Sequence, residues 1–171
     1  MSRFIQEVKR LKNLESRFED VIQGKMVPRR LRDIKLFAEI CFAKKYYAAA
    51  ARFWRLPDET GQDAIVKYKD DTLRTFALAA ARRGKDGQSV GETELPLFRS
   101  EAFCILHFEI KSTQESLPNR RMFLSILRRW RQDPALETVR HPEALAKLPP
   151  KEREDWEELW KAIDEKLSAS E

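Results

Sequence analysis

Several features that define other classes of protein are scarce in this sequence. Its 171 residues include 5 glycines, 8 prolines and 2 cysteines, too few for a loop-rich β-sandwich, a low-complexity chain or a disulfide framework. No apolar run approaches the roughly 20 residues needed to cross a bilayer, and the charged N-terminus does not have the pattern of a signal peptide. These absences predict a soluble, reduced, cytoplasmic protein with no membrane association.

What the sequence does contain favours helices. Hydrophobic residues make up 42% and charged residues 36%, against an average charged share of roughly 25%. Alanine, leucine, glutamate, lysine and arginine dominate, and these residues have high helix propensity. No segment alternates apolar and polar residues with the period of two that is typical of strands. We therefore predict an all-α fold of antiparallel helical hairpins with a C-terminal capping bundle.

The predicted helices form a single domain over residues 1–171. It comprises an N-terminal helix within 1–27, a helical hairpin over 28–57, a second unit over 58–112 and a C-terminal cap over 113–171. Apolar residues that recur every three or four positions predict the following helices: 2–23, 28–45, 46–56, a helix ending at 84, 95–111, 116–130 and a last helix from 149–150.

The connection between two of these helices, residues 84–94, is rich in glycine and polar residues. Because it has no evident apolar anchor, we expect it to be the most mobile loop of the chain. Asp63 or Asp71 is the expected cap of the helix that precedes it, and His141 the expected cap of a short turn before a proline.

Seven residues in the 28–57 hairpin have the spacing of a known helical repeat. Ala38 and Ala50 lie twelve residues apart, so two antiparallel helices can approach closely there, and larger side chains fill the space beside them. This pattern resembles the tetratricopeptide repeat, although Pro57 ends the second helix about one turn early. A degenerate second unit follows over 73–106. The predicted repeat-core residues are Ile34, Phe37, Ala38, Cys41, Tyr47, Ala50 and Trp54.

A broader resemblance covers most of the chain from about residue 18. The matching stretches are 43–53, 77–81, 130–149 and 152–160. They resemble a helical segment at the C-terminal end of large bacterial proteins of the planctomycete type, which usually carry a serine/threonine kinase domain or repeat arrays upstream. The resemblance implies a scaffold and brings no established chemistry with it. The predicted core of the C-terminal cap consists of Trp130, Leu136, Trp156 and Trp160.

Residues suited to catalysis or metal binding are few. Each histidine, His107 and His141, has a simple structural interpretation, and a metal site made of Cys41, Cys104 and His107 would lack a fourth ligand. Residues 84–87 resemble a phosphate-binding loop only superficially, because the Ser or Thr that should follow the lysine is missing. We therefore predict no catalytic site, no metal and no cofactor, and hence no enzyme.

Charge distribution suggests a second class of function. Residues 118–134 carry a net charge of +4 and residues 151–171 a net charge of −4, and we expect these neighbouring segments to neutralise each other in part. A cluster of arginines around Trp130 could instead bind phosphates while the ring stacks on a base. The residues of this candidate nucleic-acid patch are Arg120, Arg121, Arg128, Arg129 and Arg131.

The sequence thus favours a non-catalytic protein–protein interaction or assembly module whose partner is another protein. The alternatives are a nucleic-acid-binding adaptor that uses the arginine-rich helix over 120–131, and a regulatory partner of a serine/threonine kinase.

Overall fold

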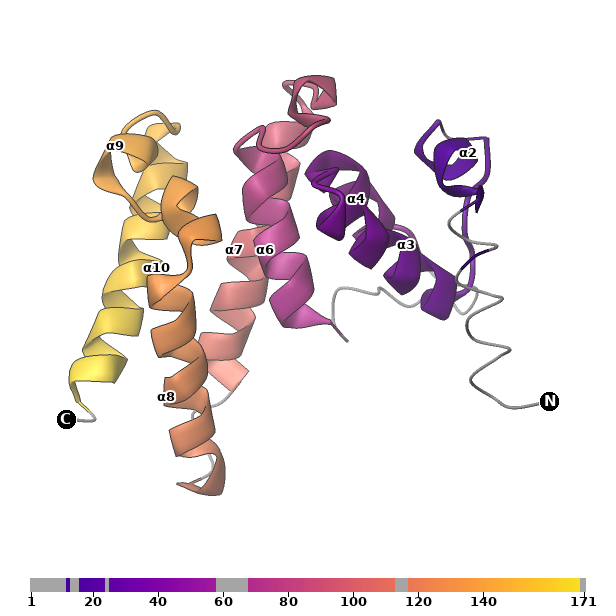
Figure 1. Cartoon of the computed structure of the whole chain (residues 1–171). Helices are drawn as coiled ribbons and strands as arrows, with labels where there is room; N and C mark the ends of the chain where they lie inside the picture. Colours follow the sequence, from indigo (N-terminus) through magenta and orange to yellow (C-terminus); the bar gives the residue numbers. More distant parts are fainter. Residues whose placement is uncertain (1–11, 13–15, 24, 58–67, 113–116, 170–171) are drawn as a thin grey trace.

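The computed structural model describes residues 12, 16–23, 25–57, 68–112 and 117–169, and these residues form helices joined by short connections (Figure 1). No β-strand occurs within these ranges, so the predicted all-α fold is confirmed. The elements are α2 (Phe18–Ile22), α3 (Leu31–Ala43), α4 (Tyr47–Trp54), α6 (Lys69–Ala80), the 3-10 helix η1 (Gly87–Ser89), α7 (Glu94–Ser112), α8 (Leu117–Gln132), the 3-10 helix η2 (Pro134–Val139), α9 (Pro142–Leu145) and α10 (Pro150–Ser168).

The helix boundaries differ from expectation at a few points. Most of the expected helix over 2–23 and the candidate cap Asp63 lie outside the described residues. Asp71 does not cap α6, because that helix begins at Lys69 and Asp71 therefore lies inside its first turn. His141 occupies the N-cap position of α9, but its side chain accepts no capping hydrogen bond. Asp133 does cap η2, and its carboxylate accepts a hydrogen bond of 2.9 Å from the Ala135 amide.

Helices α3, α4, α6 and α7 pack one after another across the molecule (Figure 1). Alanines make this close packing feasible: Ala38, Ala50, Ala77 and Ala102 are each fully buried. A small side chain at these positions lets neighbouring helix backbones approach, while large side chains beside them fill the core. Among the described helices, none has the length and apolarity that spanning a lipid bilayer requires.

The C-terminal elements cover the end of this row of helices. The 3-10 helix η2 packs on α6, and α10 packs against both α8 and α7. Trp130, Leu136, Trp156 and Trp160 are all buried, with exposures of 5% or less. The Trp160 indole donates a hydrogen bond of 2.6 Å from Nε1 to the Val139 carbonyl oxygen, which ties α10 to the end of η2.

The connection over 84–94 is firmly anchored, contrary to expectation. Val90 is only 3% exposed and belongs to the main core. The Asp86 carboxylate accepts hydrogen bonds from the Ala48 and Ala49 amides, at 3.2 and 2.8 Å. Helix α4 has no capping side chain of its own, so Asp86 satisfies amides that would otherwise be orphaned at its N-terminus.

An arginine on α4 holds the other end of the same connection. The Arg52 guanidinium donates two hydrogen bonds of 2.8 Å to the Glu94 carboxylate and one of 2.9 Å to the Ser89 carbonyl oxygen. The hydrogen bonds from Arg52, aided by one from the Gly91 amide, lower the pKa of Glu94 from its ordinary 4.5 to about 2. The sequence did not predict this anchoring, because the partners of Asp86 and Glu94 on α4 lie 37 to 42 residues away in the sequence.

We expect that replacing Ala50 by leucine will destabilise the packing of α3 and α4. Ala50 is fully buried, and extra side-chain volume in such a site costs on the order of 1–3 kcal/mol. Thermal unfolding followed by circular dichroism measures the effect. Ala43→Leu is the matched control, because Ala43 is exposed at the end of α3. An unchanged melting temperature for Ala50→Leu would contradict close packing at this position.

The low pKa of Glu94 predicts a pH-dependent contribution to stability. A carboxyl group whose pKa is lowered by folding stabilises the folded state above its unfolded pKa and loses this effect as the pH falls through its folded pKa. The advantage of the wild-type protein over Glu94→Gln should be about 1 kcal/mol at neutral pH, given solvent screening of this partly exposed pair. It should disappear between pH 4.5 and about 2. Urea denaturation of both proteins across this range provides the measurement, and a constant difference would refute the assignment.

Candidate functional site

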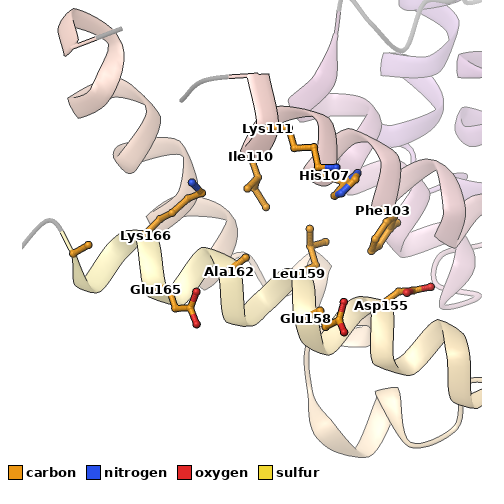
Figure 2. A pocket seen from close by; sticks show the side chains of 11 residues that line it. Phe103, His107, Ile110, Lys111, Asp155, Glu158, Leu159, Ala162, Glu165 and Lys166 are labelled. Atoms are coloured by element: carbon orange, nitrogen blue, oxygen red, sulfur yellow. The ribbon is translucent and has the colours of Figure 1, made fainter. Parts of the chain in front are cut away.

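A groove of about 740 Å³ lies between α7 and α10. Figure 2 shows side chains from both helices facing each other across it. Phe103, His107 and Ile110 come from α7, and Leu159 and Ala162 come from α10. Their spacing of three or four residues places each set on one face of its helix.

An aromatic contact joins α7 and α10 beside the groove. The ring of Phe103 meets the ring of Trp156 edge to face, with centroids 5.3 Å apart and an interplanar angle of 88°. Trp156 is 1% exposed and fixes the separation of the helices at this point. Further along α10 the facing residue is Ala162, whose side chain is too small to bridge the space to α7.

Charged side chains form the rim of the groove. The α10 side carries Asp155, Glu158, Glu165 and Lys166, while Lys111 stands on the α7 side (Figure 2). Asp155 is paired with Lys151 at 2.9 Å. Glu158 forms no ion pair with any residue that the structure describes. The groove therefore combines an apolar floor with charges that remain accessible at its edge.

One histidine, His107, lines the groove. The His107 ring stacks on Phe103, with centroids 5.4 Å apart and an interplanar angle of 23°. Over the described part of the chain, no group of three histidine, cysteine, aspartate or glutamate residues is placed to hold a metal ion. Cys41 lies in the core at α3, where burial raises the pKa of its thiol to about 12, whereas Cys104 is exposed on α7.

The residues that the sequence singled out lie in other parts of the molecule. Six of the seven repeat-core residues are buried between α3 and its neighbours, and Tyr47 is half-buried with its ring 5.2 Å from that of Phe42. The four cap-core residues are also buried, on α8 (Trp130), η2 (Leu136) and α10 (Trp156 and Trp160). None of these eleven residues lines the groove. Phe103 and Ile110 lie in the predicted helix over 95–111, but sequence alone does not show that a groove remains between this helix and α10.

Two of the five arginines of the candidate nucleic-acid patch are paired with carboxylates on different helices. Arg129 is paired with Asp70 on α6, and Arg131 binds Asp164 on α10 at 2.7 Å. The remaining three are exposed and form no ion pair within the described ranges; they are Arg120, Arg121 and Arg128. The structure thus joins the basic segment on α8 to the acidic α10, as the opposite charges of the two segments predicted.

Trp160 supports the groove from the opposite face of α10. Its ring is 5% exposed, and the guanidinium groups of Arg131 and Arg140 lie 5.9 and 5.8 Å from its centroid. Trp160→Ala should lower the free energy of unfolding by about 3–5 kcal/mol, because it leaves a large cavity. Trp160→Phe should cost less, because an aromatic ring still fills most of the site, although the hydrogen bond to the Val139 carbonyl oxygen is lost. Urea denaturation compares the two, and wild-type stability for Trp160→Ala would contradict this supporting role.

No protein-family model matches the chain, and no curated protein or solved structure shows significant similarity to it.

Proposed function

We propose that this chain is a non-catalytic protein–protein interaction or assembly module, and that its partner binds in the groove between α7 and α10. The observation that supports this proposal is the composition of the groove. Phe103 and Ala162 are half-buried and offer apolar contacts in its floor, to which Ile110 and Leu159 add little exposed surface, while Glu158 and Lys111 offer charges of opposite sign at its rim. An amphipathic partner segment is recognised by this combination.

A protein segment suits the groove better than a small ligand does. Sites for small ligands usually combine an enclosed apolar pocket with a few polar groups that converge on the ligand. Here the charged groups stand at the rim, on the two helices that border the groove (Figure 2). A partner helix that lays its apolar face on the floor would keep its polar face in water and place its charges beside Glu158 and Lys111.

The scaffold proposed for this function is a helical repeat of the tetratricopeptide type. Buried alanines at 38 and 50, and at 77 and 102, support it because they allow successive helices to pack closely. The proposed nucleic-acid alternative has less support, since Arg129 and Arg131 are already neutralised by carboxylates of the same chain. A role as the regulatory partner of a kinase is a special case of the interaction module.

A substitution that fills the groove tests the proposal. Ala162 lines the groove on α10, and Ala162→Arg would place a long charged side chain over its apolar floor. We expect the variant to fold normally and to lose affinity for proteins captured by the wild-type chain by at least about tenfold. Affinity capture from cells of the source organism, quantified by mass spectrometry, measures this loss.

The matched control is Ala146→Arg, which adds the same side chain at an exposed position outside the groove. Its captured partners should equal those of the wild-type protein. If Ala162→Arg captures the same proteins in the same amounts as the control, the groove is not the interaction site.

A further inference from the structure

A second surface, distinct from the groove, is formed by two adjacent turns that we name the basic turn pair. It consists of residues 44–46, which connect α3 to α4, and residues 81–85, which follow α6. The Lys85 amide donates a hydrogen bond of 2.8 Å to the Lys45 carbonyl oxygen and joins the two turns. In Figure 1 they lie at the same end of the molecule, where α4 begins and α6 ends.

The close contact of the two turns depends on Gly84. Its φ of +86° is favourable only for glycine, and an added Cβ atom would lie 2.3 Å from the Lys45 carbonyl oxygen. This contact holds the side chains of one turn beside those of the other. The basic turn pair is therefore a fixed feature of the fold.

Five basic side chains gather on this surface, and all are exposed: Lys44, Lys45, Arg82, Arg83 and Lys85. Three of them have identified intramolecular partners. Arg82 pairs with Glu92 at 2.5 Å, and the ammonium groups of Lys44 and Lys85 lie 5.4 and 5.3 Å from the ring centroids of Phe18 and Tyr46. Lys45, Arg83 and Lys85 form no ion pair with the residues that the structure describes. Asp86, the nearest acidic residue in sequence, is already engaged by two amides of α4.

Helix dipoles offset only part of this positive charge. The C-terminal ends of α3 and α6 both lie at the basic turn pair, and each is equivalent to roughly half a negative charge. Together they offset about one of the five cations, and Glu92 and Asp86 offset two more. A net positive charge of about two therefore remains on the two turns.

Backbone conformation gives a second, independent indication of function. Lys45 and Arg82 have φ values of 64° and 52°, in the left-handed region that follows the last turn of α3 and of α6. Glycine is the favoured residue at this position after a helix. Both turns instead carry a basic residue there, at a cost in backbone strain, and such strained positions occur preferentially at functional sites.

We propose that the basic turn pair binds an acidic segment of a partner protein. Its cations occupy a compact area that matches a short run of carboxylates. Its one aromatic ring, that of Tyr46, already has Lys85 over it at 5.3 Å, and on the flanking helices the rings of Phe42 and Tyr47 pack on each other at 5.2 Å. A single-stranded nucleic acid would need such rings to stack its bases, so the surface suits carboxylates better.

The test measures the binding of a fluorescein-labelled, glutamate-rich peptide to the full chain by fluorescence anisotropy at low salt. The first variant replaces three cations of the basic turn pair by glutamine, namely Lys45→Gln, Arg83→Gln and Lys85→Gln. The control replaces three unpaired arginines of α8, namely Arg120→Gln, Arg121→Gln and Arg128→Gln. Both variants lose three positive charges, so they differ only in where the charge was removed.

We expect the first variant to bind the peptide at least about tenfold more weakly than the wild-type protein, and the control to differ by less than about twofold. Equal losses in both variants would mean that only net charge matters and would overturn the proposal. Tighter binding of a single-stranded oligonucleotide of the same charge, lost in the first variant, would assign the surface to nucleic acid instead.

Lys45→Gly separates binding from stability at the same surface. Glycine favours the left-handed backbone of this position, so the melting temperature should stay equal or rise while the affinity for the peptide falls. A lower melting temperature with unchanged peptide affinity would assign Lys45 to stability and contradict the proposal. The groove variant Ala162→Arg should bind the peptide normally, which distinguishes this proposal from that of the groove.

Discussion

The arrangement of the helices depends on a hydrogen-bonded contact between one carboxylate and a distant helix. The Asp86 carboxylate accepts hydrogen bonds from the amides of Ala48 and Ala49, which lie 38 and 37 residues away in the sequence. Only three residues separate α3 from α4, and the N-cap residue of α4, Tyr46, makes no capping hydrogen bond with its side chain. Asp86 supplies the cap, and in doing so it fixes the segment between α6 and α7 against the turn between α3 and α4. The basic turn pair lies at that contact, where the Lys85 amide also binds the Lys45 carbonyl oxygen.

Arginine–carboxylate pairs join the helices at several other points. Arg52 binds Glu94, Arg99 binds Glu152 and Arg131 binds Asp164, so the pairs connect α4 to α7, α7 to α10 and α8 to α10. Most are partly exposed and contribute little stability individually. Their planar, two-pronged geometry instead favours one relative position of the two helices. These pairs also explain how a chain that is 36% charged can form a compact row of helices.

The two proposed interaction surfaces arise from different physical causes. The groove remains open because Ala162 is too small to continue the contact that Trp156 makes with Phe103. The basic turn pair remains positively charged because its five cations outnumber the two nearby carboxylates, Asp86 and Glu92. One surface is therefore apolar with a charged rim, and the other is almost purely cationic. A partner that contacts both would be held by two chemically distinct segments.

Local properties of the sequence determined the all-α fold and most helix limits, because helix periodicity and capping depend on residues only three or four positions apart. They also indicated which alanines and tryptophans are buried. Only the tertiary structure decided how Asp86 and Arg52 hold the 84–94 connection, which arginines of α8 are neutralised, and where α7 and α10 leave a groove. These features depend on contacts between residues tens of positions apart, and such contacts are set by how whole helices pack rather than by any local pattern.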